Sequence, residues 1–443
     1  MSRVYISTVG CLKNEEDSER VAGLLSAGGH EIVFSPEEAE VLVVNTCAFI
    51  EDAQRESIDE LLSLAEYRED GKKLIAMGCL TQLYADELAE SLPEVDAILG
   101  VNEHAAIADV VNGIEGRSVL TDGVPGIAMT ERYALTPRHS ATLKIAEGCS
   151  NSCTYCIIPK IRGPYRSAPK EALVAEAEKL ASEGCKELVV IAQDTSLYGI
   201  DIYGRLCLPE LLRELCAVEG IEWIRLLYCY DERVTDELIE AMASEPKILH
   251  YIDMPIQHIS GAVLGRMGRA SSPGGIRDTL ARLHTAMPDI TVRSSLITGF
   301  PGETEEEFEE LCEFVGEGLI ARVGIFTFSP VAGTPAAAMD DQVQAGTSEA
   351  RRAELMEIAR GNSLAANEAF VGSIMDVIVD EPEAEAENGI WLGRTKKDAP
   401  EVDGAVIFSV PAGSAERDLS GHIIKVRIDD AMDYDLVGVM IEQ

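Results

Sequence analysis

The feature that most constrains the fold is a regular alternation of short apolar runs with longer amphipathic stretches, which continues from the N-terminus to about Ser329. Short apolar runs bounded by turn residues are typical of buried strands, and a 3.6-residue apolar period is typical of helices. Strands that alternate with helices form βα units, whose strands pair in parallel. The sequence therefore predicts an α/β protein built on parallel sheets.

In the first region, one cysteine follows each predicted strand. The strands are Val4–Val9, Glu40–Val44 and Lys73–Met77, the helices are Glu15–Ala27, Ala53–Ala65 and Leu83–Ser91, and the cysteines are Cys11, Cys47 and Cys79. The carboxyl ends of parallel strands meet at one edge of a sheet, where α/β proteins bind ligands. A single such cysteine is most often a packing residue. Three at equivalent positions favour a three-thiolate iron–sulfur cluster.

A second group of cysteines lies in a single short loop. Cys149, Cys153 and Cys156 have the spacing C-x3-C-x2-C, which is typical of a 4Fe–4S cluster held by three thiolates. Three ligands leave one iron open, and an open iron can chelate the amino and carboxylate groups of S-adenosylmethionine. Gly148 would let the backbone approach the cluster, and Tyr155 would offer an aromatic face to adenine. A zinc knuckle or three buried thiols are the alternatives, but a zinc site usually needs a second, distant pair.

The central region predicts six βα units, which favours an open (β/α)6 partial barrel over a closed eight-stranded one. The strand candidates are Thr142–Ile145, Glu187–Ile191, Trp223–Leu227, Tyr251–Met254, Thr291–Leu296 and Gly324–Phe328. Functional side chains of such a barrel lie at the carboxyl ends of its strands. The candidates for cofactor binding are Tyr155 in the cysteine loop and, at the strand ends, Gln193, Asp194, Gln257 and Gly299. Some of these residues are equally suited to capping loops or helices.

The last region changes its period. A connecting helix over Thr347–Phe370 precedes five short strand candidates, which predict a small antiparallel β-barrel: Ile374–Val379, Ile390–Thr395, Ala405–Val410, Ile423–Ile428 and Leu436–Ile441. The expected domain boundaries are 1–116 for the N-terminal domain, 117–134 for a linker, 135–366 for the central domain and 367–443 for the barrel.

Composition limits the surroundings and the partners. The N-terminus has no signal-peptide core, and no apolar stretch approaches the roughly 18 residues of a membrane span, so we expect a cytoplasmic protein with reduced thiols and no membrane contact. The formal net charge is −40. Such a surface repels phosphate backbones and favours basic partners, although adaptation to salt or simple solubility would give the same composition.

Together these residues resemble the radical-SAM methylthiotransferase family over nearly the whole chain. The resemblance is carried by Gly10–Asn14, Asn45–Cys47, Gly78-Cys79, Cys149–Arg166, Gly299–Glu303 and Ser329–Ala336. It implies an N-terminal methylthiotransferase domain, a radical-SAM domain and a C-terminal TRAM-like barrel. It also implies two 4Fe–4S clusters as cofactors, the metal ligands being Cys11, Cys47, Cys79, Cys149, Cys153 and Cys156. S-adenosyl-L-methionine would serve as co-substrate in two roles, radical generation and methylation of sulfur.

Within that family, the chain is similar to the RimO branch, which modifies the β-carbon of an aspartate in small-subunit ribosomal protein twelve. The stretch Asp253–Ser260 resembles that branch, whereas enzymes that modify a tRNA adenosine typically carry Gln-Ser-Gly-Ser there. The residues Gly10–Asn14 are also similar to it. The resemblance implies a flavodoxin or ferredoxin as the electron donor and leaves the sulfur donor unknown.

The charge of the last region agrees with a protein substrate. Residues 368–443 hold 17 acidic and six basic side chains, a net charge of −11. A barrel that grips RNA should carry a basic face with aromatic residues, so tRNA is the less favoured substrate. A tRNA-modifying methylthiotransferase stays the nearer alternative. A non-catalytic iron–sulfur sensor or RNA-binding module is the farther one.

Overall fold

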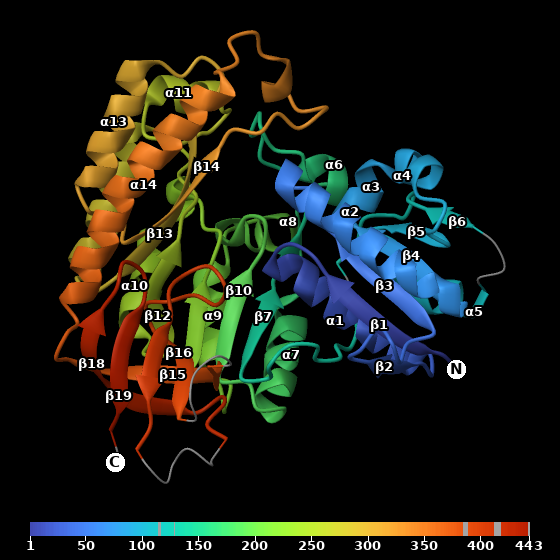
Figure 1. Cartoon of the computed structure of the whole chain (residues 1–443). Coiled ribbons are helices and arrows are strands. Elements are labelled where there is room, and N and C mark those ends of the chain that lie inside the picture. Colours follow the sequence, from blue (N-terminus) through green and yellow to red (C-terminus); the bar gives the residue numbers. More distant parts are fainter. Residues whose placement is uncertain (114–116, 128, 384–388, 412–417, 442–443) are drawn as a thin grey trace. The chain divides into compact units, whose positions relative to one another are not determined.

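The computed structural model describes residues 1–113, 117–127, 129–383, 389–411 and 418–441. The chain forms two compact units (Figure 1). The first consists of residues 1–136, 144–172 and 329–337, and the second of residues 137–143, 173–328 and 338–443. None of the described helices combines the length and the apolar composition that a membrane crossing requires.

The first unit is built on a six-stranded sheet in the order β2-β1-β3-β4-β5-β6, and every pair in it is parallel. The strands are β1 Arg3–Thr8, β2 Glu31–Val33, β3 Val41–Thr46, β4 Lys73–Gly78, β5 Ala97–Gly100 and β6 Ser118–Leu120. The helices are α1 Leu12–Ala27, α2 Glu51–Ala65, α3 Cys79–Leu83, α4 Ala85–Ser91 and α5 Ile107–Gly113. The predicted parallel sheet is therefore confirmed.

Apolar side chains fill both faces of this sheet. Leu42 and Val44 of β3 belong to one buried cluster, whereas Val41 and Val43 belong to another. Successive side chains of a strand point to opposite faces, so a run in which every residue is buried requires cover on both sides. This explains why β3 is a continuous apolar run rather than an alternating one.

Three short strands of this sheet were missed by the prediction. β2, β5 and β6 have three or four residues each, too few to show a period. β6 falls inside the predicted linker 117–134, of which residue 128 lies outside the described residues. The single helix predicted over Leu83–Ser91 is instead the pair α3 and α4, which meet at Tyr84, whose φ of −128° and ψ of 35° interrupt the helix.

The central sheet has the order β14-β13-β12-β11-β10-β7 and is open. Its strands are β7 Ser140–Lys144, β10 Glu187–Ile191, β11 Trp223–Leu226, β12 Ile248–Asp253, β13 Thr291–Thr298 and β14 Arg322–Thr327. The helices are α7 Lys170–Ser182, α8 Ile200–Tyr203, α9 Leu208–Cys216, α10 Asp236–Ser244, α11 Gly261–Arg266, α12 Pro273–Ala286, α13 Glu305–Gly316 and α14 Ala345–Glu368. All six predicted strands are present, and an open α/β arrangement is confirmed.

The C-terminal region is a closed five-stranded barrel in the order β15-β16-β17-β19-β18. Its strands are β15 Ile374–Pro382, β16 Ile390–Thr395, β17 Val406–Ser409, β18 Ile423–Ala431 and β19 Leu436–Met440. Alternate residues such as Val377, Val379, Phe408 and Val426 fill its interior. The predicted barrel is confirmed, although β17 and β19 pair in parallel while the other four pairs are antiparallel. A closed ring with an odd number of strands cannot alternate direction throughout, so one parallel pair is required.

A buried ion triad joins this barrel to the central sheet within the second unit. Glu187, the first residue of β10, accepts hydrogen bonds from Arg225 of β11 at 2.8 Å and from Arg394 of β16 at 2.6 Å. Burial alone raises the pKa of the Glu187 carboxyl, but the guanidinium groups of Arg394 and Arg225 outweigh it and lower that pKa to about 2. Arg225 also donates to the main-chain oxygens of Thr395 and Lys396.

We expect Glu187→Gln to destabilise the protein at neutral pH by about 3 kcal/mol, because it leaves the buried guanidinium of Arg225 without a carboxylate among the described residues and leaves Arg394 with Asp380 alone. A depressed folded-state pKa gives stability that is present above the unfolded-state pKa, near 4.5, and is lost as the pH falls toward 2. The difference between wild type and variant, measured by urea unfolding, should therefore shrink below pH 4.5. A difference that stays constant from pH 7 to pH 3 would contradict this role.

Candidate functional site

The first cysteine triad lies at the carboxyl edge of the N-terminal sheet. Cys11 immediately precedes α1, Cys47 follows β3, and Cys79 is the first residue of α3. The strands that lead to them, β1, β3 and β4, are neighbours in the sheet. Cys11 is exposed, whereas Cys47 and Cys79 are buried. The structure thus places the three thiols at the expected edge.

The thiols of this triad influence one another. The pKa of the Cys47 thiol is raised to about 11, mainly by burial and in smaller part by Cys11 and Cys79, against a backbone hydrogen bond from Phe49. The pKa of Cys79 is also raised, mainly by burial. Thiols in such surroundings become ligands only when a metal displaces their protons.

Two glycines make room beside these sulfurs. Gly10 has a φ of +112°, and a Cβ built on it would lie 2.8 Å from Cys47 Cβ and 2.9 Å from Cys47 Sγ. Gly78 has a φ of +109°, and its Cβ would lie 2.4 Å from Asn45 Oδ1. A side chain at Gly10 would therefore fill the space in front of a proposed ligand.

Asn14 holds two of the cysteine loops together. Its side-chain amide donates hydrogen bonds to the main-chain oxygen of Val9 at 2.8 Å and to that of Thr46 at 3.2 Å. These oxygens lie two residues before Cys11 and one residue before Cys47. The backbone N–H of Cys47 donates to Ser57 Oγ at 2.8 Å. The loops are thus fixed from the side of α1 and α2.

The second triad lies in the loop 148–157, between β8 (Ala146–Glu147) and α6 (Ile158–Arg162). The pKa of Cys156 is raised to about 12, mainly by burial and in smaller part by the neighbouring Cys153 and Cys149, against a backbone hydrogen bond from Ile158. The backbone N–H of Asn151 lies 3.4 Å from Cys149 Sγ. The three sulfurs of this loop are therefore gathered in one place.

The loop closes against the turn that follows α6. The N–H of Cys149 donates to the main-chain oxygen of Gly163 at 3.1 Å. Gly148 has a φ of +74°, and a Cβ there would lie 2.3 Å from Pro164 O. Gly148 is thus required because two backbone segments approach closely here. This is a structural reason for the glycine, in addition to its expected role beside a cluster.

A buried network of ionised groups lies between the two triads, inside the first unit. Arg162 Nη1 contacts Asp17 Oδ2 at 2.9 Å and Glu147 Oε2 at 3.1 Å. Lys144 Nζ contacts Glu16 at 2.7 Å and Glu147 at 2.9 Å, and it also pairs with Asp17. Burial raises the pKa of Glu147, but Arg162 and Lys144 outweigh it and hold that pKa well below its usual range. The carboxyl of Glu147 is therefore charged.

The sequence reasoning missed this network. Its members come from α1, β7, β8 and α6, and no local pattern marks them. A polar run such as Lys13–Arg20 in a helix is typical of a solvated face, yet all of it except Glu15 is buried in the structure. The one available signal was that the charged run of α1 directly follows Cys11, a predicted ligand.

Four predicted cofactor-binding residues follow strands of the central sheet. Gln193 and Asp194 follow β10, Gln257 follows β12, and Gly299 follows β13. Asp194 is buried and accepts hydrogen bonds from Arg233 at 2.8 Å and from Ser196 at 2.7 Å. A Cβ on Gly299 would lie 1.8 Å from Ser348 Oγ of α14. Packing and ion pairing thus explain Gly299 and Asp194 without a ligand.

Backbone strain marks the same edge of the sheet. Among the described residues, only three other than glycine have a positive φ: Tyr228, Gln257 and Glu401. Tyr228 (φ 60°) follows β11, and Gln257 (φ 74°) follows β12. Strain of this kind is retained mostly where function needs it. Tyr228 was missed because a left-handed residue leaves no trace in the sequence pattern.

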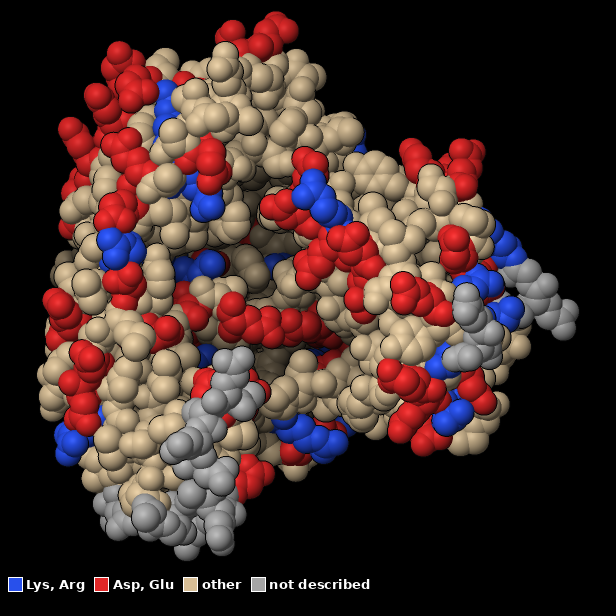
Figure 2. Space-filling view, in the orientation of Figure 1, with Lys and Arg blue, Asp and Glu red and all other residues tan. Residues whose placement is uncertain are grey.

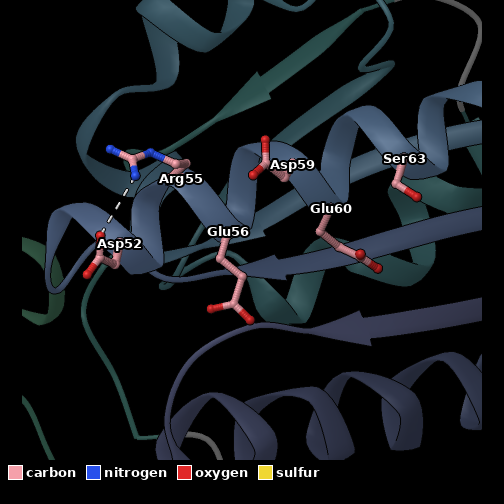
Figure 3. A pocket seen from close by; sticks show the side chains of 6 residues that line it. All are labelled: Asp52, Arg55, Glu56, Asp59, Glu60 and Ser63. Atoms are coloured by element: carbon pink, nitrogen blue, oxygen red, sulfur yellow. Dashed lines mark ion pairs between the residues drawn. The ribbon is translucent and has the colours of Figure 1, made fainter.

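Helix α2, which begins four residues after Cys47, carries acidic side chains around a shallow surface pocket. Figure 3 shows Asp52, Glu56, Asp59 and Glu60 spread along the helix rather than converging on one point. In the part of the chain that the structure describes, no three or more His, Cys, Asp or Glu side chains lie close enough together to bind one metal ion in common. The thiols of a cube each bind a different iron, so they stand farther apart than the ligands of one ion.

Three family models match the chain. One described as uncharacterized protein family UPF0004 matches residues 3–100, the radical SAM superfamily matches residues 143–315, and the TRAM domain matches residues 371–441. Among solved structures, the radical S-adenosylmethionine methyltransferase TsrM from Kitasatospora setae aligns over 76% of this chain and 77% of its own. Its TM-score is 0.56 at 16% identity, which shows a shared fold.

Curated relatives extend over the whole length. The ribosomal protein uS12 methylthiotransferase RimO of Lachnoclostridium phytofermentans is 45% identical over 98% of this chain and 99% of its own. The RimO proteins of Trichlorobacter lovleyi and of Thermoanaerobacter sp. are 44% and 43% identical, over 100% and 99% of this chain and 98% and 100% of their own. With three matching domains and relatives of this similarity, the chain belongs to the RimO family of radical-SAM methylthiotransferases.

Proposed function

We propose that this protein transfers a methylthio group to the β-carbon of an aspartate in ribosomal protein uS12, using S-adenosylmethionine and two 4Fe–4S clusters. The observation that carries the proposal is the presence of two separate three-thiol sites, one at a sheet edge and one in a single loop. The radical-SAM family accounts for one cluster and for S-adenosylmethionine. The second cluster is inferred from Cys11, Cys47 and Cys79.

The residues present fit these groups. Each site offers three thiols, the ligands that iron–sulfur clusters take, and at the first site a glycine leaves open the space that a side chain would fill. When bound, one cluster and S-adenosylmethionine would supply the radical chemistry, and the second cluster would hold the sulfur that is methylated and transferred. No ionisable side chain could replace them, because the proton on the target carbon is far too weakly acidic.

The chain's own residues position and shield these sites. Cys47, Cys79, Cys149 and Cys153 are buried, which limits access of water to the ligands. Asn14 fixes the loops of Cys11 and Cys47. The hydrogen bond from the N–H of Cys149 to the main-chain oxygen of Gly163 fixes the loop of the second triad.

For S-adenosylmethionine we propose contacts from Tyr155, Gln193, Asp194, Gln257 and Gly299. Among these residues, Gln257 has the strongest support as a ligand contact, because its backbone is strained. Its N–H donates to the main-chain oxygen of Ser295, and its C=O accepts from the N–H of Ile297, both in β13. These bonds fix the backbone of the turn that carries the side chain. Asp194 also pairs with Arg233, and Gly299 also packs closely against α14, so both residues have a structural role beside the proposed contact.

The charge of the surface supports a basic protein as substrate. Figure 2 shows acidic side chains gathered along the exposed faces of α13, α14 and α2. In the barrel, the basic residues that the structure describes are already engaged. Arg394 pairs with Glu187 and Asp380, Lys396 and Lys425 with Asp376, and Arg427 with Asp429, while Lys397 donates to Asp289 O. Little positive charge is therefore left for a phosphate backbone.

The remaining parts of the proposal follow from the family resemblance. A flavodoxin or ferredoxin would supply electrons in the cytoplasm, and the sulfur source is not specified by any residue. We propose domain boundaries at 1–116, 117–134, 135–366 and 367–443. The three family models lie within the first, third and fourth of these ranges.

Replacing Gly10 by alanine should remove one cluster. The new Cβ would press on Cys47 Sγ, so anaerobic reconstitution should give about four irons per chain instead of about eight. Gly29→Ala is the matched control, because Gly29 also has a positive φ (+84°) but has no atom within 4 Å of an added Cβ. Equal iron content in the two variants, measured by iron and sulfide analysis, would argue against a cluster beside Gly10.

The proposed reaction is tested by offering the reduced, reconstituted enzyme two substrates. We expect a methylthio mass increase on the uS12 aspartate and none on tRNA adenosine, with the rate on uS12 falling as ionic strength rises, because opposite charges steer the encounter. Mass spectrometry of both substrates gives the readout. A methylthio group found on tRNA alone would contradict this function and support a tRNA-modifying methylthiotransferase instead.

A further inference from the structure

Arg162 has no role in the proposed function, although its side chain is buried close to the first cysteine triad. It is the last residue of α6, and only 3% of it is exposed. Its Nη2 donates to Asn14 Oδ1 at 2.9 Å and reaches Cys79 Sγ at 3.4 Å. Asn14 is the same side chain that ties the loops of Cys11 and Cys47. Arg162 thus contacts Cys79 directly and is linked through Asn14 to the loops of Cys11 and Cys47.

The other side of the guanidinium meets the loop of the second triad. Nη1 donates to both oxygens of Glu147, at 3.2 and 3.1 Å. Glu147 Oε1 in turn accepts from the N–H of Gly148 at 3.1 Å, directly before Cys149. Arg162 is followed by Gly163, whose main-chain oxygen accepts from the N–H of Cys149. A single buried side chain thus contacts one proposed ligand, Cys79, directly and is linked to the loop of the second triad through Glu147.

A hydrogen bond to a ligating thiolate withdraws electron density from the cluster and raises its reduction potential. Arginine is suited to this, since its guanidinium is always charged and presents its donors in a rigid fork. Here the fork is held from its other side by Asp17 and Glu147, so the donor to Cys79 cannot turn away without leaving a buried charge unpaired.

We propose that Arg162 is a positioning residue that donates a hydrogen bond to the Cys79 thiolate and thereby raises the reduction potential of the cluster on Cys11, Cys47 and Cys79. The inference rests on the proposed function, in that it requires this second cluster. Through this hydrogen bond, Arg162 would make the reduction potential of one cluster differ from that of the other cluster in the same chain.

The chain provides a matched control in Lys144. This residue lies in the same buried network and carries the same charge, but its contacts among the described residues are with the carboxylates of Glu16, Asp17 and Glu147. Removing either cation changes the network by one charge. Only removal of Arg162 takes a donor away from a sulfur.

The experiment uses full-length protein in which Cys149, Cys153 and Cys156 are replaced by alanine, so that one cluster remains. Arg162→Gln and Lys144→Gln are added separately, iron is measured, and the midpoint potential is determined by EPR-monitored titration with dithionite. We expect about four irons in each protein and a more negative midpoint for Arg162→Gln than for Lys144→Gln. Equal midpoints would overturn the proposal, because charge alone would then explain the effect.

If Arg162→Gln does not fold, Asp17→Asn/Arg162→Gln keeps the network's charge balanced, with Asp17→Asn as its reference. A midpoint of the double variant more negative than that of Asp17→Asn supports the proposal, and an unchanged midpoint overturns it. Absence of iron from the alanine background would instead contradict the second cluster, and with it the proposed function. The two failures are therefore distinguishable.

Discussion

The buried ionic network around Arg162 and Lys144 is the interaction on which the candidate site depends. A buried charge without a partner costs several kcal/mol, and breaking a buried pair typically costs about 3–5 kcal/mol. Both cations are shared among carboxylates from α1 and β8, so no member can move alone. The network therefore fixes the loops of both cysteine triads relative to each other within one compact unit.

The positions of the triads follow from the topology of a parallel sheet. β1, β3 and β4 lie side by side, and the chain leaves each of them at the same edge, which is why cysteines 36 and 32 residues apart come together. The loop triad needs no such assembly, because its ligands lie within eight residues. One site is thus made by tertiary structure and the other by local sequence, and both require glycines with positive φ beside the ligands.

Much of this could be predicted from the sequence. Apolar period and cysteine spacing gave the two sheets, the small barrel and the candidate ligands, because these depend on neighbours in the chain. The contacts of Arg162 with Asn14 and Cys79 could not be predicted, since they join residues 148 and 83 positions apart. The parallel pair β17–β19 depends on closure of the ring, and Tyr228 depends on backbone strain. None of these leaves a local signal.

The central claim is that two cysteine triads in one chain support separate steps, radical generation at the loop and sulfur transfer at the sheet edge. The most direct test is a variant with Cys11, Cys47 and Cys79 replaced by alanine, assayed with S-adenosylmethionine, a reductant and uS12. We expect the variant still to release 5′-deoxyadenosine and to form no methylthiolated uS12. Methylthiolated product from this variant would contradict the central claim.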